Sequence, residues 1–440
     1  MPGGMPNISL WRSPETKLKL EKASTDKEEE ELLEKLMLQR HDEDGNNVPA
    51  TYGTIDFGLV RHWDNDAPTR FMVVSSRTGP QSICKVMTDV WHLARPSAIL
   101  SVTGGAASLV IDAQLEAAYV KGLANAAQST RSWIITGGSD AGVMALTGKV
   151  LSSAYPHPRP HPHPRPRPHT HTQTHPHYSI KVMSWLGAGT PCIGIAPFDV
   201  VMYKDKLVKA PEVDLLTRRG GGLSRLNAKK KKKGLEVKYW KQDKPLPGKE
   251  TAIDPNHTHF VLVDNADKKG FGGEVEMRAA IEEYMAREAG GAKGEVPLVC
   301  LCVGGGPNTF FTLLEQIRLQ NMVLLLAESG GAAGAITKFI EAYREAFPQQ
   351  DATEQQLIAL VDTLAVDELI SEQEQKQIKS HAKADKTGKV TTVARVLVDA
   401  VTATPQRIHF HKQEDGPFGE VRLGLEGWGL GFVGCIHFSS

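Results

Sequence analysis

The 440-residue sequence predicts a doubly wound α/β fold, in which helices cover both faces of a mostly parallel sheet. Continuous apolar segments recur through the middle of the chain, as in HFVLVDN (259–265), and a strand buried on both faces has this composition. Segments with apolar residues at helical spacing alternate with them, as in 274–288. Glycine-rich turns join four of the strands to the helices that follow.

The predicted elements follow one another in a regular order. Residues 51–57 and 70–76 have the period of two that is typical of half-buried strands. From residue 97 onward, strands and helices alternate, and the segments concerned are 97–128, 132–151, 190–201, 259–288, 296–317 and 322–347. We therefore expect a polar, disordered arm over 1–49, the α/β domain over 50–347, and a helical extension with an irregular, truncated tail over 348–440.

Two insertions interrupt the predicted domain. Residues 155–178 contain eight Pro and seven His, which excludes helix and sheet and indicates an exposed, extended segment. Metal binding by its histidines is a weaker interpretation, and a translated simple repeat explains the composition equally well. Residues 218–250 include five consecutive Lys, which favour a solvated loop over a lipid or nucleic-acid patch.

The composition excludes several classes of protein. Lys plus Arg (51) equals Asp plus Glu (51), so we expect no nucleic-acid partner. Five scattered Cys do not make a disulfide scaffold, and they agree with a reducing, cytoplasmic environment. The sequence has neither a signal peptide nor a run of about 18 apolar residues, so we expect no membrane span.

The glycine turns carry the functional prediction. In a parallel sheet the carboxyl ends of the strands share one edge, where ligands bind at a topological switch point. Glycine lets the backbone approach an anion, and helix N-termini offer N–H groups to it. We predict a phosphorylated, nucleotide-sized ligand at this edge, although close packing alone also explains any single turn. The predicted hydroxyl donors are Thr103, Thr136, Ser139, Thr309 and Ser329, beside Gly104, Gly105, Gly137, Gly138, Gly142, Gly305, Gly306 and Gly330.

Three other polar residues have more than one interpretation. His257 and His259 are expected on one face of a strand, where packing and hydrogen bonding are favoured over a metal pair. Asp264 ends the same strand and is predicted either to accept ribose hydroxyls or to cap the next helix. We predict no metal site and no cofactor.

Several motifs in order resemble the N-terminal cytosolic homology region of melastatin-type TRP (TRPM) cation channels over about residues 50–345. They are TYGTIDF, WHLARPSAILSVTGG, GLANAAQSTRSWIITGGSDAGVM, IGIAPF, NHTHFVLVDN, VEMRAAIEEYM, VPLVCLCVGGGPNT and SGGAAG. The resemblance implies a Rossmann-like fold of the SLOG type, related to the LOG nucleotide hydrolases. It further implies a sensor for ADP-ribose or related nucleotides on the cytosolic face of a tetrameric, Ca²⁺-permeable channel.

Residue by residue, the resemblance supports the glycine turns and adds Arg278, which matches the Arg of the family's LR pair. Arg278 is expected either to grip a phosphate or to pair on a helix surface with Glu274 or Glu282. The chain departs from the family at Glu328-Ser329-Gly330-Gly331-Ala332-Ala333-Gly334, where nucleotide-binding members have Gly-Ser-Gly-Arg-Ala-Ala-Asp.

The resemblance to the LOG hydrolases fails at one position. Thr312 stands where their motif carries a catalytic Glu, so we predict binding without turnover and no catalytic residue. The alternatives are a stand-alone LOG-like nucleoside monophosphate phosphoribohydrolase and a domain that serves only as an assembly surface. The pore and transmembrane helices of such a channel are not part of this sequence.

Overall fold

A computed structural model describes the parts of the chain that form the folded domain. The described residues are 29, 31–42, 45–58, 68–106, 109–154, 190–208, 235–239, 250–288, 295–348, 352–353, 356–357, 359–360 and 407–412. The insertion predicted at 155–178 and most of the tail predicted over 348–440 lie outside them.

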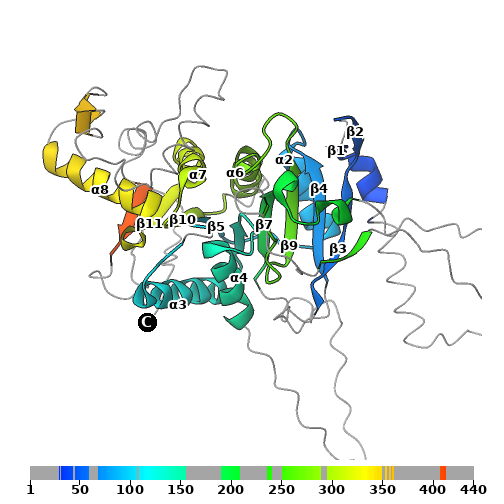
Figure 1. The fold of residues 1–440 in the computed structure, drawn as a ribbon, viewed down its shortest axis with the longest axis horizontal. Coiled ribbons are helices and arrows are strands. Elements are labelled where there is room, and N and C mark those ends of the chain that lie inside the picture. The colour runs from blue at the N-terminus through cyan, green and yellow to red at the C-terminus, as the bar shows by residue number, and fades with distance from the viewer. Residues whose placement is uncertain are drawn as a thin grey trace, which may run out of the picture.

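A ten-stranded sheet runs through the whole domain in the order β12-β11-β10-β5-β6-β7-β9-β4-β3-β8 (Figure 1). The β3–β4 pair is antiparallel and every other neighbouring pair is parallel. The strands are β3 (Thr51–Asp56), β4 (Thr69–Ser75), β5 (Ile99–Gly104), β6 (Trp133–Thr136), β7 (Cys192–Pro197), β8 (Leu235–Lys238), β9 (His259–Asp264), β10 (Leu298–Val303), β11 (Met322–Leu326) and β12 (Ile408–His411).

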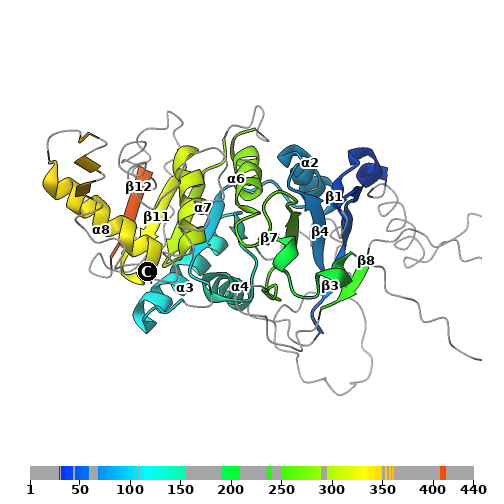
Figure 2. The same cartoon turned by 45° about the horizontal axis from the view of Figure 1, so that its top comes forward.

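Helices cover both faces of this sheet, which confirms the predicted fold class (Figures 1 and 2). On one face lie α2 (Pro80–Lys85), α6 (Val275–Glu283), α7 (Pro307–Arg318) and α8 (Gly331–Ala346). On the other face lie α3 (Ala113–Ser129) and α4 (Gly142–Ala154). None of the helices in the described ranges is long and apolar enough to span a bilayer.

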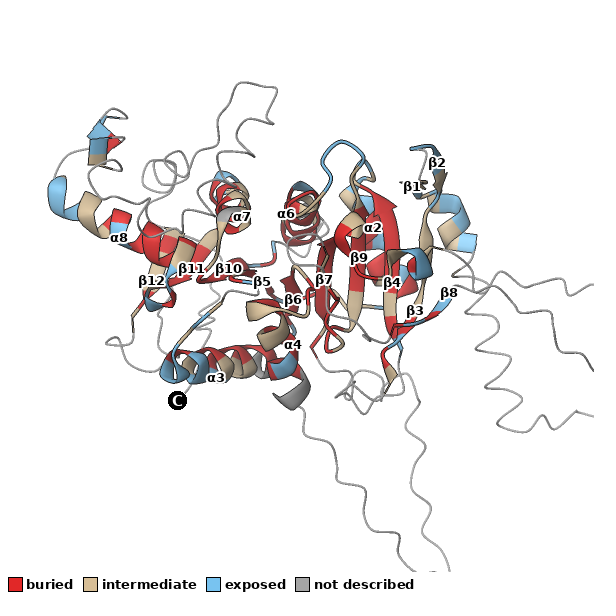
Figure 3. Ribbon diagram, in the orientation of Figure 1, coloured by how far each residue is buried: buried red, intermediate tan, exposed pale blue. Residues whose placement is uncertain are grey.

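The core follows from the composition of the central strands. Every residue of β6, β7 and β10 is buried, and Figure 3 shows the central strands as an almost unbroken buried block. Alternate side chains of β10 enter the cores of opposite faces: Cys300 and Cys302 pack against α7 and α8, and Leu301 packs on the side of α3. A strand covered on both sides needs apolar residues at every position, which explains the continuous apolar runs.

One helical segment and four short strands occur outside the domain limits or strands that the sequence predicts. Residues 31–36 are helical, and β1 (Gln39–His41) pairs with β2 (Asn47–Pro49) inside the segment expected to be a disordered arm. Strand β8 lies inside the predicted insertion 218–250, and β12 lies in the predicted irregular tail, where it extends the sheet beside β11. Each of these strands has at most four residues, too few to show a periodic pattern.

The topological switch point lies between the neighbouring strands β5 and β10. From β5 the chain passes through α3 to β6, and from β10 it passes through α7 to β11, on the other side of the pair. Because α3 and α7 cover opposite faces, the two connections diverge at this place. Ligands of doubly wound proteins bind in this position.

Candidate functional site

The structure brings the four glycine turns into contact along the carboxyl edge of the sheet. The N–H of Val143 donates to the carbonyl of Gly105 (2.9 Å), which joins the turns after β6 and β5. The Thr309 hydroxyl donates to the carbonyl of Gly104 (3.2 Å), and the N–H of Ala332 donates to the carbonyl of Gly305 (2.9 Å). The predicted residues of all four turns therefore form one continuous rim.

Two of the glycines are required by this close contact. Gly142 and Gly331 each have a φ of +52°, which favours glycine. A Cβ on Gly142 would lie 2.1 Å from the carbonyl oxygen of Gly105, and one on Gly331 would lie 2.3 Å from that of Gly305. The family's Arg at position 331 therefore does not fit the backbone seen here.

Most helix N-termini at the rim already have acceptors for their amides. In α4 the Val143 amide is bound as described, and in α8 the amides of Ala332 and Ala333 donate to Gly305 and Gly304. The Asp112 side chain caps α3 by accepting from two amides. Among these four helices, α7 begins without a side-chain cap and without a hydrogen bond from one of its first amides to a neighbouring turn, and its N-cap residue is Gly306.

The predicted hydroxyl groups brace the turns. Ser329 Oγ accepts from the Gly304 amide (2.6 Å) and donates to the Leu326 carbonyl. Thr136 Oγ1 accepts from the Gly138 amide (2.8 Å). The two remaining predicted donors, Thr103 and Ser139, are also buried.

A buried Thr–His–Asp network lies behind the second turn. His257 Nε2 is 2.7 Å from Thr136 Oγ1, and His257 Nδ1 is 2.7 Å from Asp254 Oδ2. Burial alone lowers the pKa of His257, but contacts with Cys192 and with the Asp254 carboxylate outweigh it and raise the pKa to about 10. This network holds the turn in place, and no feature of the sequence singled out Asp254.

The two histidines do not share one face, contrary to expectation. Strand β9 begins at His259, so His257 lies in the preceding turn and packs against Phe260. His259 stacks on Trp91, with ring centroids 4.9 Å apart, on the opposite side of the sheet. Within the described ranges, no group of three or more His, Cys, Asp or Glu side chains is placed to hold a metal ion.

A loop that was not among the predicted site residues also reaches the rim. Residues 265–273 connect β9 to α6, and Lys268 extends from this loop to the first turn of α7, where Nζ lies 5.7 Å from the Phe311 ring centroid. A Cβ on Gly272 would lie 3.4 Å from the side-chain oxygen of Asn308. The sequence Lys-Lys-Gly-Phe-Gly-Gly after a strand was the available sign of this loop.

The start of α7 thus combines several polar groups. Asn308 Oδ1 is buried and has no hydrogen-bond partner. Burial raises the pKa of the Glu274 carboxyl, while the charges of Arg278 and Lys268 act in the opposite direction. A cation, an uncapped helix N-terminus and an unsatisfied buried oxygen therefore lie at the same place, beside the switch point.

Arg278 is buried inside the domain. Its Nε donates to Glu282 (2.9 Å), which agrees with the expected i, i+4 pair except that the pair is buried and not on a helix surface. Its Nη2 donates to Ser101 Oγ (2.8 Å) and to the carbonyls of Val102 (3.0 Å) and Ile135 (3.2 Å). Arg278 therefore ties α6 to β5 and β6 directly below the rim.

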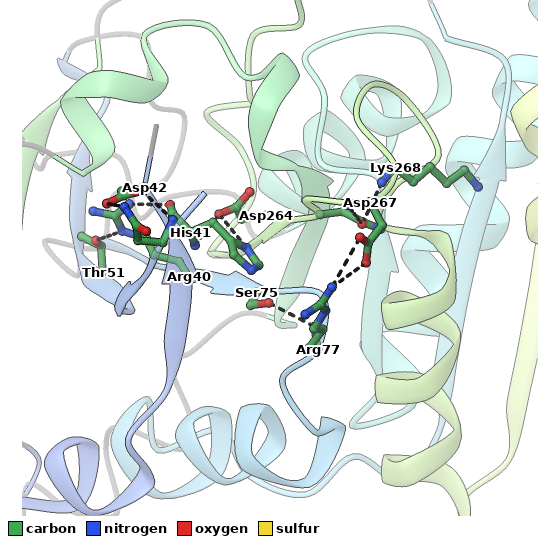
Figure 4. Close-up of polar contacts among 11 residues, drawn as sticks. Arg40, His41, Asp42, Thr51, Ser75, Arg77, Asp264, Asp267 and Lys268 are labelled. Atoms are coloured by element: carbon green, nitrogen blue, oxygen red, sulfur yellow. Dashed lines mark hydrogen bonds and ion pairs between the residues drawn. The ribbon is translucent and has the colours of Figure 1, made fainter. Parts of the chain in front are cut away.

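Asp264 is covered by the β1–β2 hairpin (Figure 4). One of its carboxylate oxygens accepts from the backbone N–H of His41 (2.7 Å) and lies 3.4 Å from the His41 ring. Nearby, Arg77 pairs with Asp267 (3.0 Å) on the exposed side of the same edge. The structure thus assigns Asp264 an intramolecular partner and does not bring it to the β5–β10 switch point.

Comparison with known proteins agrees with this architecture. Residues 69–163 and 184–382 match the family model described as SLOG in TRPM. The chain is 29% identical over 291 residues to a TRP cation channel subfamily M member-like 2 protein of Nematostella vectensis, covering 65% of this chain and 16% of that protein. It is 26% identical over 272 residues to subfamily M member 2 of Rattus norvegicus, covering 61% of this chain and 15% of that protein.

A third relative is subfamily M member 1 of Mus musculus, which is 28% identical over 298 residues, covering 67% of this chain and 15% of that protein. The chain thus spans about one-sixth of the length of the relatives it matches. The family match covers more than half of the chain and includes β4 to β11, the part that forms the rim. This chain belongs to the family of SLOG domains found in TRPM proteins.

Proposed function

We propose that this chain is a nucleotide-sensing regulatory domain that binds a ligand of the ADP-ribose class and does not turn it over. In this proposal it acts on the cytosolic side of a TRPM-like, Ca²⁺-permeable cation channel. Its partners are the remainder of the channel and the neighbouring subunits of a tetramer. The named relatives are cation channel subfamily members, and this chain matches about one-sixth of their length.

We propose that the start of α7 binds a phosphate group of the ligand. A helix N-terminus attracts anions through its N–H groups and its dipole. In α7 the first residue, Pro307, has no N–H, and the Thr309 amide donates to the Gly306 carbonyl (3.0 Å), so the Asn308 N–H and the helix dipole would attract the anion. The Lys268 ammonium adds a positive charge at the same place, and the unsatisfied Asn308 oxygen offers an acceptor for a ligand hydroxyl. The other rim helices donate their first amides to acceptors within the protein, so the start of α7 is the place at this rim that we propose for a phosphate group.

We propose that the domain does not hydrolyse its ligand because Thr312 stands where a catalytic acid or base would be needed. Thr312 lies in the first turns of α7 and is buried, and its hydroxyl donates to the Asn308 carbonyl (3.2 Å). A hydroxyl engaged with the backbone is neither the acid nor the base that glycosyl-bond hydrolysis requires.

A second candidate function is assembly alone. The hydrogen bonds between the turns favour it, because Val143, Ala332 and Ala333 use their amides within the protein. On this account the glycines serve close packing, and no nucleotide binds.

Calorimetric titration of the 440-residue chain with ADP-ribose and with AMP separates the two candidates. Binding that weakens about tenfold or more in Lys268→Ala supports the phosphate site, since a hydrogen bond to a charged group contributes about 1.5–3 kcal/mol. Lys121→Ala, an exposed position on α3, is the control and should bind as the wild type does. No heat of binding with either nucleotide would leave assembly as the function.

Incubation with AMP tests the absence of turnover. We expect no adenine above the buffer control by chromatography. Release of adenine that disappears in a Thr309→Val variant would establish the hydrolase alternative instead.

A further inference from the structure

The side chain of Leu109 occupies the β5–β10 switch point. A Cβ on Gly105 would lie 2.8 Å from Leu109 Cδ1, and a Cβ on Gly304 would lie 2.9 Å from the same atom. The methyl group therefore rests against the backbone of both turns. These glycines leave room for an aliphatic side chain at the place where a ligand of this fold class would enter.

Leu109 is not part of a helix or strand. Its N–H donates to the Ala106 carbonyl (3.0 Å), and its side chain is partly buried at the margin of the core beneath α3. Its neighbour Val110 is 86% exposed. Because Leu109 is a partly buried, peripheral member of this cluster, its displacement from between the two turns leaves the buried members packed together.

We propose that Leu109 is an intramolecular plug that competes with the nucleotide for the switch point. The inference rests on the proposed function and concerns the regulation of the same site. A nucleotide that extends between Gly105 and Gly304 and the Leu109 methyl group that lies there exclude each other sterically. Binding therefore requires Leu109 to leave, and it then becomes exposed beside Val110. A ligand-dependent apolar patch is thereby created on the surface.

The plug lowers the apparent affinity, because only the fraction of molecules with Leu109 displaced is competent to bind. Calorimetry with ADP-ribose on the full chain tests this. We expect Leu109→Ala to bind about tenfold more tightly than the wild type, given the apolar area that Leu109 buries. Val110→Ala, one residue away and exposed, should bind as the wild type does.

The possible outcomes distinguish failure of the plug proposal from failure of the proposed nucleotide binding. Equal or weaker binding by Leu109→Ala, with measurable binding by the wild type, overturns the plug and leaves the nucleotide site standing. Absence of binding in both proteins overturns both proposals.

A second measurement does not depend on the stability of the Ala variant. In Leu109→Cys, ADP-ribose should accelerate modification of the new thiol by a maleimide, because ligand binding moves the side chain to the surface. The described cysteines Cys84, Cys192, Cys300 and Cys302 are buried, and the wild type measured in parallel gives the background. A rate that falls or stays constant on adding ADP-ribose contradicts the plug.

Discussion

Substitution of Arg278 tests whether this residue stabilises the fold or binds the ligand. Glu282 has no exposed surface and accepts hydrogen bonds from Arg278, from Ser101 Oγ (2.6 Å) and from Gln316 Nε2 (2.7 Å). Arg278→Met removes the positive charge and leaves this carboxylate buried without compensation. Loss of one partner of a buried ion pair costs about 3–5 kcal/mol.

We therefore expect Arg278→Met to lower the free energy of unfolding by about 4 kcal/mol at neutral pH. Urea denaturation followed by tryptophan fluorescence, to which the buried Trp91 and Trp133 contribute, measures it. Neutralising the carboxylate as well, with Glu282→Gln, should recover about half of the loss, because the remaining penalty comes from unsatisfied hydrogen bonds.

Arg77→Met is the matched control. Arg77 pairs with Asp267, but both side chains are more than two-thirds exposed, and exposed pairs contribute about 0–1 kcal/mol. A loss in Arg278→Met as small as that in Arg77→Met, together with loss of nucleotide binding, would refute the structural account and make Arg278 a ligand contact.

Two further predictions concern the rim. The folded-state pKa of His257, about 10, lies above its ordinary value of 6.5, so its contribution to stability is complete below pH 6.5 and is lost as the pH rises toward 10. Urea midpoints between pH 6 and 10 should fall accordingly, and His257→Gln should remove most of this slope; an unchanged slope contradicts the assignment. Gly331→Ala should cost about 2 kcal/mol or more by thermal unfolding, because its Cβ meets the Gly305 oxygen. Gly79→Ala, with a φ of −63° and open space around it, should change the stability by less than about 0.5 kcal/mol, and equal losses at the two positions would contradict the role of the contact and of the positive φ at Gly331.

The sequence predicted the central sheet because its strands have a local signature. A strand such as β10 is apolar at every position and ends in a glycine turn. This local pattern alone indicates a strand that is buried on both faces of a parallel sheet. Strands β8 and β12 were missed because four residues carry no comparable pattern, and their pairing with β3 and β11 decides their conformation.

The candidate site was predictable only in its outline. The four turns had to share an edge once the sheet was parallel, but the hydrogen bonds that use their amides join residues far apart in the sequence. The burial of Arg278 depends on acceptors in β5 and β6. The position of Leu109 depends on two glycines nearly two hundred residues apart. Such contacts leave no periodic trace in the chain.

The hydrogen bonds between the turns have a mechanical consequence. They form an unbroken relay from the first residues of α4, through the ends of β5 and β10, to the first residues of α8. Since α4 and α8 lie on opposite sides of the sheet, these bonds join the first turns of helices in both layers. Moving one turn without the others therefore requires hydrogen bonds to break.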